Sequence, residues 1–323
     1  MKNVKVILIS VVLCAAVFAN SRIAALGGDA GFWPGDKANI AIFPATINDH
    51  DFVELDGIGS DNDGTTADTG VDATILWGDA TTWGFNFDGD DAATWMNIMW
   101  GNGDVGLSVQ YMADKGNTET DGFAIGYGQN FEWGELGCGF TSVDDATSYW
   151  ANWRDDMDVW VFDSAKASLM STDDGSDNTT MSLGFDMFTH LDAGGADVLF
   201  GLGVDYATAS NGTDDATSMT LPTATLAVEA GLTDWATLRA WATHTYDFSC
   251  TNDGLAGECT DDTNGPNDGN DTSYGFGLGF NWGQATLDMQ VGEGLFLDPV
   301  TTMSGWEDAD LASEASVTLS YSF

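Results

Sequence analysis

The segment "SVTLSYSF", residues 316–323, alternates apolar and hydroxyl side chains along its whole length. Val317, Leu319, Tyr321 and Phe323 fall on one side, and serine and threonine fall on the other, which is the period-two pattern of a β-strand. A strand that ends on a large aromatic residue is a poor terminus for a soluble domain, because a free strand edge invites unwanted pairing. We therefore expect a neighbouring strand to hold this one.

The same alternation recurs through the chain. Apolar residues occupy one face of "TWGFNFD" (82–88), "TMSLGFDMFT" (180–189), "DVLFGLGVDY" (197–206) and "SYGFGLGFNW" (273–282). The opposite face holds many glycines and few long charged side chains. Glycine weakens an ordinary strand because it has no side chain to pack. It is tolerated where strands curve into a closed barrel whose interior is polar or tightly filled.

Short links between these segments alternate with longer, mostly acidic ones, as in bacterial outer-membrane barrels. Keeping that rhythm unbroken requires strands at 49–57 and 147–155, which raises the expected count from fourteen to sixteen. The sequence thus predicts an all-β fold over residues 49–323: a transmembrane, antiparallel, up-and-down β-barrel of 14–16 strands. An even strand number puts both ends of the barrel chain on the periplasmic side.

Residues 1–19 have the pattern of a secretory signal peptide, with Lys2 and Lys5 before an apolar run over 6–17. That run is too short for a spanning helix, so we expect an exported protein. Residues 20–48 lie between the leader and the first expected strand. They are expected to form a periplasmic lead-in or a plug in the pore.

Without the leader, six basic residues stand against 51 acidic ones, a net charge near −45. Such a surface repels nucleic acid and anionic headgroups and favours cations or basic partners. Adaptation to salty surroundings, or solubility alone, is the alternative reading. The acidic residues concentrate in turn-forming stretches at 57–70, 171–180, 209–218 and 250–271.

Two further features suit an outer-membrane location. Several of the thirteen Trp residues lie at expected strand ends, as in the aromatic girdles at membrane interfaces. "SVTLSYSF" also resembles the C-terminal signature of Gram-negative outer-membrane β-barrel proteins, with a final Phe preceded by alternating apolar residues. This porin-like resemblance implies outer-membrane lipid as surroundings, and recognition of Tyr321 and Phe323 by the barrel-assembly machinery.

A second resemblance lies just after the leader, in "AALGGDAGFWPGDKANIAIFPATIND" (24–49). It is similar to the opening of the group that includes the long-chain fatty-acid transporter type and PorV-like proteins. The matching residues are Leu26, Gly27, Gly28, Asp36, Asn39, Pro44 and Ala45, and Phe43 replaces the usual Asn. The resemblance implies that this segment lies in or under a barrel, which in that group commonly has fourteen strands.

Catalytic motifs are missing from the sequence. His50, His190 and His244 have no zinc spacing, and no nucleophile elbow or phosphate loop occurs. We expect no enzyme, no cofactor and no metal site, although a Ser, His and acid on separate strands remain an open alternative. The Asp-rich stretches 61–64 and 266–271 lack full calcium-loop spacing, so solvated loops are expected there.

The expected function is an outer-membrane channel for small solutes that prefers cations. Strand alternation points Asp186, Asp205, Glu229 and Asp288 into the lumen, with Arg239 as a lumen cation able to pair with one of them. A crowd of carboxylates in a water-filled pore concentrates cations. One alternative is a surface scaffold or binding protein with a plugged lumen and functional acidic loops, and another is a soluble, acidic β-sandwich.

Two cysteines flank an acidic loop of this exported chain. Cys250 and Cys259 are predicted to form a disulfide because oxidising compartments favour one. Two free thiols are the alternative. Cys138, within "GELGCGF", is expected to be a small apolar filler.

Overall fold

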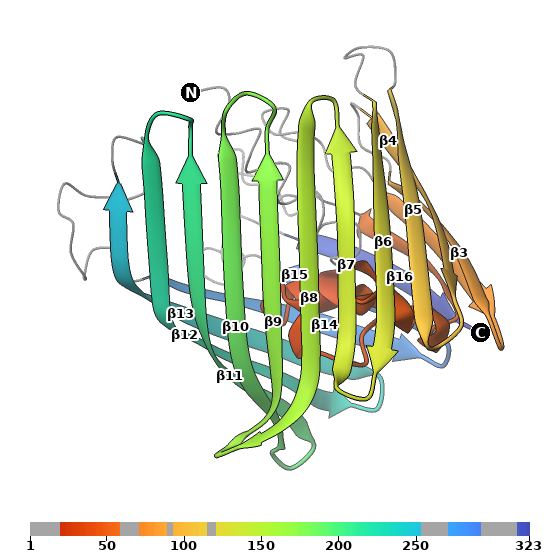
Figure 1. The fold of residues 1–323 in the computed structure, drawn as a ribbon. Helices are drawn as coiled ribbons and strands as arrows, with labels where there is room; N and C mark the ends of the chain where they lie inside the picture. The colour runs from red at the N-terminus through yellow and green to blue at the C-terminus, as the bar shows by residue number, and fades with distance from the viewer. Residues whose placement is uncertain (1–19, 59–70, 89–92, 115–120, 253–270, 292–314) are drawn as a thin grey trace, which may run out of the picture.

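Sixteen strands close into one antiparallel barrel (Figure 1). The computed structural model describes residues 20–58, 71–88, 93–114, 121–252, 271–291 and 315–323. The strands are β1 (Phe52–Ile58), β2 (Asp72–Gly78), β3 (Thr82–Asp88), β4 (Ala93–Gly101), β5 (Val105–Asp114), β6 (Gly122–Phe131), β7 (Gly134–Val143), β8 (Ala146–Val159), β9 (Phe162–Asp173), β10 (Thr179–Asp192), β11 (Ala196–Ser210), β12 (Asp215–Thr233), β13 (Ala236–Asn252), β14 (Asp271–Trp282), β15 (Ala285–Val291) and β16 (Ala315–Ser322).

The predicted up-and-down barrel is confirmed, at the upper end of its expected strand number. Each strand pairs with its neighbours in sequence, and β16 pairs with β1 to close the ring. Both segments that raised the count are strands, since 49–57 contains most of β1 and 147–155 lies within β8. Leu319 of the C-terminal segment pairs with Leu55 on one side and Leu287 on the other. The last strand therefore has no free edge.

The outer and inner faces differ as the alternation predicts. On the outer face of β1–β6, a single register row contains the exposed apolar residues Val53, Ile75, Phe85, Ile98, Val109 and Ile125. The neighbouring row on the inner face of β1–β4 contains the buried polar residues Glu54, Thr74, Asn86 and Asn97. Apolar residues thus point away from the barrel and polar residues point into it, the reverse of a soluble barrel.

The two ends of the barrel have different connections. At one end, two or three residues join each strand to the next, for example 79–81, 132–133 and 283–284. Phe323 lies at this end, where its backbone N–H donates to the carbonyl oxygen of Asp51. We call this the short-turn end. Exposed tryptophans gather there, at Trp77, Trp83, Trp133, Trp160, Trp235 and Trp282.

The residues before β1 form four short helical turns inside the barrel, near its short-turn end (Figure 1). These are α2 (Ser21–Ala24), η1 (Ala30–Phe32), η2 (Lys37–Ala41) and η3 (Pro44–Asp49). We call residues 20–51 the luminal segment. No helix among the described residues is long and apolar enough to cross a membrane.

Local sequence explains these short helical turns. The first three each follow an Asn or Asp cap, because the side-chain oxygens of Asn20, Asp29 and Asp36 accept hydrogen bonds from the backbone N–H groups of Ile23, Gly31 and Ala38. The fourth begins with Pro44, whose fixed φ suits a first helical position. Caps at such close spacing keep every turn short.

Candidate functional site: the luminal segment and its cavity

The luminal segment contacts opposite parts of the barrel wall. Helix α2 packs on β14, β15 and β16, whereas η3 packs on β3–β7. The sequence left two positions open for residues 20–48, periplasmic lead-in or plug. The structure has the segment within the lumen, so the inner face of the barrel must supply both its apolar and its polar partners.

A row of paired glycines brings the backbone of the segment against the wall. Gly101, Gly106, Gly128 and Gly137 pair in register across β4–β7. A Cβ atom at Gly106 would collide with the carbonyl oxygen of Pro44, and one at Gly137 would collide with that of Ile42. Glycine is required here because only a residue without a side chain permits such close backbone approach.

Apolar contacts complete this side of the interface. Ile40 and Ile47 of the segment pack with Leu76 and Met99 of the wall, and all four side chains are at most 1% exposed. A second cluster joins the segment to the opposite wall and contains Ile23, Leu26, Phe32, Trp33, Phe188 and Leu199. The free energy from burying these side chains holds the segment at two sides of the lumen.

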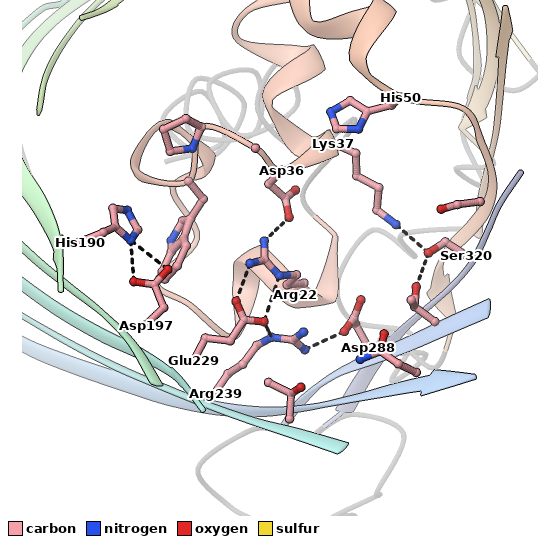
Figure 2. Close-up of a pocket in the computed structure, with 17 residues that line it drawn as sticks. Arg22, Asp36, Lys37, His50, His190, Asp197, Glu229, Arg239, Asp288 and Ser320 are labelled. Carbon is pink, nitrogen blue, oxygen red and sulfur yellow. Dashed lines mark hydrogen bonds and ion pairs between the residues drawn. The ribbon is translucent and has the colours of Figure 1, made fainter. Parts of the chain in front are cut away.

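Charged side chains connect the segment to β12, β13 and β15. Arg22 pairs with Asp36 of its own segment and with Glu229 of β12. Arg239 of β13 donates to Glu229 at 3.0 Å and to Asp288 of β15 at 2.6 Å. The five residues form one continuous chain of alternating charge, which Figure 2 shows across the centre of the site. Such mutual pairing offsets much of the penalty for burying the two guanidinium groups.

Lys166, Lys37 and Arg154 also connect the luminal segment to the barrel wall. Lys166 of β9 bridges Asp29 of the segment at 2.7 Å and Asp186 of β10 at 2.8 Å. Lys37 of the segment donates to Ser320 of β16 at 2.8 Å and pairs with Glu54 of β1.

Arg154 of β8 is 5% exposed and reaches the segment from the strand beside β9. It donates to the carbonyl oxygen of Gly31 and to Asn39, each at 3.0 Å, and it pairs with Glu135 of β7. Its guanidinium lies 4.5 Å from the ring centre of Phe43. The planar guanidinium can make these bonds together, which an ammonium group cannot.

The scarce basic residues therefore share one location. Among the six outside the leader, Lys115 lies outside the described residues. The other five either belong to the luminal segment or pair directly with it or with its partner Glu229, and they are Arg22, Lys37, Arg154, Lys166 and Arg239. In a chain this acidic, every described Lys and Arg holds the luminal segment.

A cavity of about 600 Å³ lies between the segment and the β10–β16 side of the wall (Figure 2). Its lining includes Arg22, Lys37, Asp197, Glu229, Arg239 and Asp288. Thr237, Asn281, Thr286 and Ser322 also line it. These four lie within two residues of a short turn or of the chain end, so the cavity is at the short-turn end.

His190 joins the segment to the rim of this cavity. Its Nε2 lies 2.7 Å from the carbonyl oxygen of Phe32, and its Nδ1 lies 2.9 Å from Asp197. Both nitrogens face acceptors, so both hydrogen bonds form together only in the doubly protonated ring. The ring also packs edge-on against Trp33, with 4.8 Å between ring centres.

The structure brings together most of the lumen residues that the sequence proposed. Glu229, Arg239 and Asp288 belong to one charge chain, and Asp186 pairs with Lys166. Asp205 takes no part in these ion pairs and accepts a hydrogen bond from Thr223 at 2.9 Å. Their predicted role in selectivity stays a prediction.

Sequence reasoning missed the partners that the segment itself supplies, chiefly Arg22, Asp29 and Lys37, together with Arg154 and Lys166 on the wall. The rarity of Lys and Arg was the available signal, because a scarce charge in so acidic a chain is expected to have a specific partner.

The remaining predicted sites are the C-terminal aromatic residues and the cysteines. Tyr321 donates to Gln284 at 2.7 Å at the end of β16. Cys250 lies in β13, whereas Cys259 is outside the described residues, so the predicted bridge stays a prediction; Cys138 is a free thiol. In the described ranges, no cluster of three or more His, Cys, Asp or Glu side chains is arranged for a metal ion.

Comparisons with known proteins give little beyond architecture. No protein-family model matches the chain, and no curated protein matches it. A solved bacterial polysaccharide outer membrane secretin aligns over 84% of this chain and 97% of its own, with 11% identity and a TM-score of 0.47. A mutant of Rh. blastica porin aligns over the same shares, with 13% identity and a TM-score of 0.35.

Both TM-scores lie below 0.5, so the strand pairing of the chain itself establishes the barrel. The resemblance to fatty-acid transporters and PorV-like proteins gains no support from these matches and stays a prediction. The sixteen strands also differ from the fourteen that this resemblance implied.

Proposed function

We propose that this chain is an outer-membrane β-barrel channel for small hydrophilic solutes, with no catalytic step. The observation that carries the proposal is the reversed barrel: apolar side chains outside and ion-paired polar side chains inside. An apolar outer belt suits lipid, and the exposed tryptophans at the short-turn end suit an interface. By the usual arrangement of such barrels, the short-turn end faces the periplasm.

The solute route in this proposal follows the polar side of the luminal segment. On the β3–β7 side, the backbone of the segment lies directly against the backbone of the glycine row, and buried apolar side chains fill the rest of the contact. On the β10–β16 side, the segment meets the wall through charged side chains and borders the cavity. Water and hydrophilic solutes are far better accommodated by the second side.

Cation preference is the finer part of the proposal. The charge chain holds two guanidinium groups and three carboxylates, and Lys166 lies between two carboxylates. Each of these clusters therefore keeps one negative charge after pairing. The net charge near −45 adds attraction at the barrel ends, and salt screens it as the Debye length falls to about 3 Å at 1 M.

A second candidate is a scaffold or binding protein with a plugged lumen. The contacts that hold the luminal segment on different parts of the wall favour it. In the channel, solute either passes beside a fixed segment or crosses after the segment moves. In the scaffold, the segment stays in place and blocks the lumen.

A reversible tether tests this difference. The hydroxyl oxygens of Ser21 in the segment and Ser316 in β16 are 3.2 Å apart, which suits a disulfide in the double variant Ser21→Cys/Ser316→Cys. Conductance in planar bilayers would be measured oxidised and reduced. The single variants and the unsubstituted protein, treated with the same reductant, are the controls.

If the segment moves during conduction, oxidation should abolish the current and reduction should restore it. If solute passes a fixed segment, conductance should be the same in both states. No current in either state, together with current after removal of residues 22–48, would favour the plugged scaffold over the channel.

Reversal potentials in a salt gradient test the cation preference. The Asp205→Asn variant is cleaner than a change at Glu229 or Asp288, because each of those would remove one of the two ion-pair partners of Arg239. We expect a cation-selective pore whose preference weakens in this variant. An anion-selective pore would contradict the proposal.

A further inference from the structure

We propose that the hairpin between β8 and β9 binds a periplasmic protein, through an extended basic segment of that protein that adds as a strand to a free edge of β8. The inference goes beyond the channel, and it rests on the proposed function in one respect, the orientation of the short-turn end toward the periplasm. We call residues 155–163, "DDMDVWVFD", the β8–β9 arm.

The β8–β9 arm extends past the neighbouring hairpin. The last pair between β7 and β8 is Glu135 with Arg154, whereas β8 continues to Val159. Strand stagger gives the hairpins of a barrel some overhang, but β6 exceeds its pairing with β5 by residues 130–131 alone. Figure 1 shows the β8–β9 hairpin reaching beyond the turn between β6 and β7.

One edge of the arm is free. Asp155, Asp156 and Val159 pair with β9 on one side. On the other side, no strand in the described part of the chain pairs with residues 155–159. An unpaired edge presents backbone N–H and C=O groups to which an incoming strand can bond. The arm is therefore a template for strand addition.

The charge of the arm selects the incoming strand. Asp155, Asp156, Asp158 and Asp163 give it four carboxylates, and its sequence contains no basic residue. These charges, with a bulge in β8 between Asp156 and Val159, discourage pairing with an identical or neutral edge. Opposite charges across a strand pair are instead stabilising. A segment that places Lys or Arg opposite the exposed Asp156 and Asp158 fits this edge.

Trp160 supplies an apolar anchor at the tip of the arm. Its side chain is 85% exposed, and it lies between the exposed Val159 and Val161. The backbone of Trp160 has a φ of 59°, a conformation that turns usually give to Gly, Asn or Asp. The other described non-glycine residues with positive φ are both Asp, at 144 and 177. A bulky ring in a strained turn, left mostly in solvent, contributes little packing and indicates contact with a partner.

Lipid is a poor partner for this tip. Trp153 lies on the outer face, and its indole N–H donates to the carbonyl oxygen of Trp133 at 3.1 Å, which suits a membrane interface. Asp155 follows Trp153 on the same face, so the chain is already acidic one step farther out. Anionic headgroups repel the carboxylates on both sides of Trp160. A basic protein segment satisfies these charges and the apolar anchor together.

Hydrogen exchange of the full chain in detergent tests strand addition. The probe is a blocked hexapeptide in which lysine and valine alternate. One control peptide has glutamate in place of lysine, and another has three lysines followed by three valines. We expect the alternating peptide to slow exchange at residues 155–159 about tenfold, because strand pairing protects amides. No slowing, or equal slowing by either control peptide, would overturn the proposal.

A pair of double variants locates the charge contact. Asp156→Asn/Asp158→Asn should weaken peptide binding about fivefold, because two pairs of opposite charge are lost. Asp79→Asn/Asp104→Asn removes two exposed carboxylates from other short turns and should leave binding unchanged. Equal weakening in both double variants would mean that the peptide responds to total charge, and the proposal would fail.

Trp160→Asn separates binding from folding. Asn tolerates a positive φ, so this variant should keep the heat-dependent gel mobility of the parent and bind the alternating peptide about tenfold more weakly. Trp282→Asn, at an exposed tryptophan that ends β14, is the control and should bind as the parent does. Unchanged affinity in Trp160→Asn would refute the anchor and the proposal with it.

Membrane contact and conductance are tested separately. In a phosphatidylcholine nanodisc without peptide, residues 157–160 should exchange as fast as in detergent. Slower exchange in the nanodisc would assign the arm to the membrane interface and overturn the proposal. Conductance without peptide binding would refute this inference alone, and peptide binding without conductance would refute the channel alone.

Discussion

Gly106 of β5 lies directly against the carbonyl oxygen of Pro44, so closely that a methyl group at Gly106 has no room. The contact is backbone to backbone, and the collision therefore cannot be relieved by a side-chain rotation. Either the luminal segment or the strand must move. A substitution at Gly106 therefore tests whether the segment is docked against β5.

We predict that Gly106→Ala undocks η3 while the barrel survives. Overpacking at a tight contact costs about 1–3 kcal/mol, and η3, which is not held by strand pairing, should yield before the sixteen paired strands do. Hydrogen exchange of the amides at 40–50 should accelerate, with unchanged heat-dependent gel mobility. Gly231→Ala is the matched control, because a Cβ there meets nothing within 4 Å. Equal protection in both variants would contradict the docked arrangement.

Arg154→Lys should loosen the segment over residues 29–39. The substitution keeps the positive charge and loses the simultaneous bonds to Gly31, Asn39 and Glu135. Losing one bond to a charged group costs about 2 kcal/mol, so exchange at 29–39 should accelerate by at least tenfold. If Lys proves equivalent to Arg, charge alone holds this side and the planar bonding is unimportant.

Docking should also weaken in mild acid through His50, which follows η3. Burial lowers the pKa of His50, and Lys37 adds to this effect, against the opposite influence of Asp36, Asp49 and Asp51. A pKa below the usual value of about 6.5 means that the docked state favours the neutral ring. The stabilisation is present above pH 6.5 and is lost as pH falls through the lowered pKa.

Hydrogen exchange at residues 44–50, corrected for intrinsic rates, should therefore show less protection at pH 5 than at pH 7.5. His50→Gln should reduce that difference. Asp29 does not interfere in this window, because Lys166 outweighs the effect of burial and holds the pKa of Asp29 below its usual value. Greater protection of residues 44–50 at pH 5 than at pH 7.5 would contradict this prediction.

Deleting Phe323 should reduce assembly of the barrel in the outer membrane. Its backbone N–H reaches Asp51, just before β1, at the seam where β16 closes the ring. Detergent fractionation and heat-dependent gel mobility would measure assembled barrel against periplasmic precursor. Phe323→Tyr, which keeps a terminal aromatic, is the control. Full assembly of the deletion variant would remove the proposed role of this residue.

Local patterns were enough to predict the barrel and the faces of its strands. The alternation in 82–88 correctly points Trp83, Phe85 and Phe87 outward, because side-chain period follows directly from strand geometry. The expected rhythm of short and long links led to β1 and β8. These features depend on residues that are neighbours in sequence.

The candidate site depends on residues that are far apart. Arg22 meets Glu229 across 207 positions, and that pairing exists only once the barrel closes in its observed register. The inner glycines indicated a polar or tightly filled interior, but nothing in them identified Pro44 or Ile42 as the filling. Composition alone could indicate that scarce cations need partners, without naming those partners.

The contact between Ser21 and Thr318 has a consequence for the order of folding. The backbone N–H of Ser21 donates to the Thr318 hydroxyl across 297 positions, and Lys37 likewise reaches Ser320. Contacts of such high sequence separation form slowly, because loop-closure entropy must first be overcome. The contacts of α2 and Lys37 must therefore wait for the last strand, whereas η3 can dock on β3–β7 before β16 closes the ring.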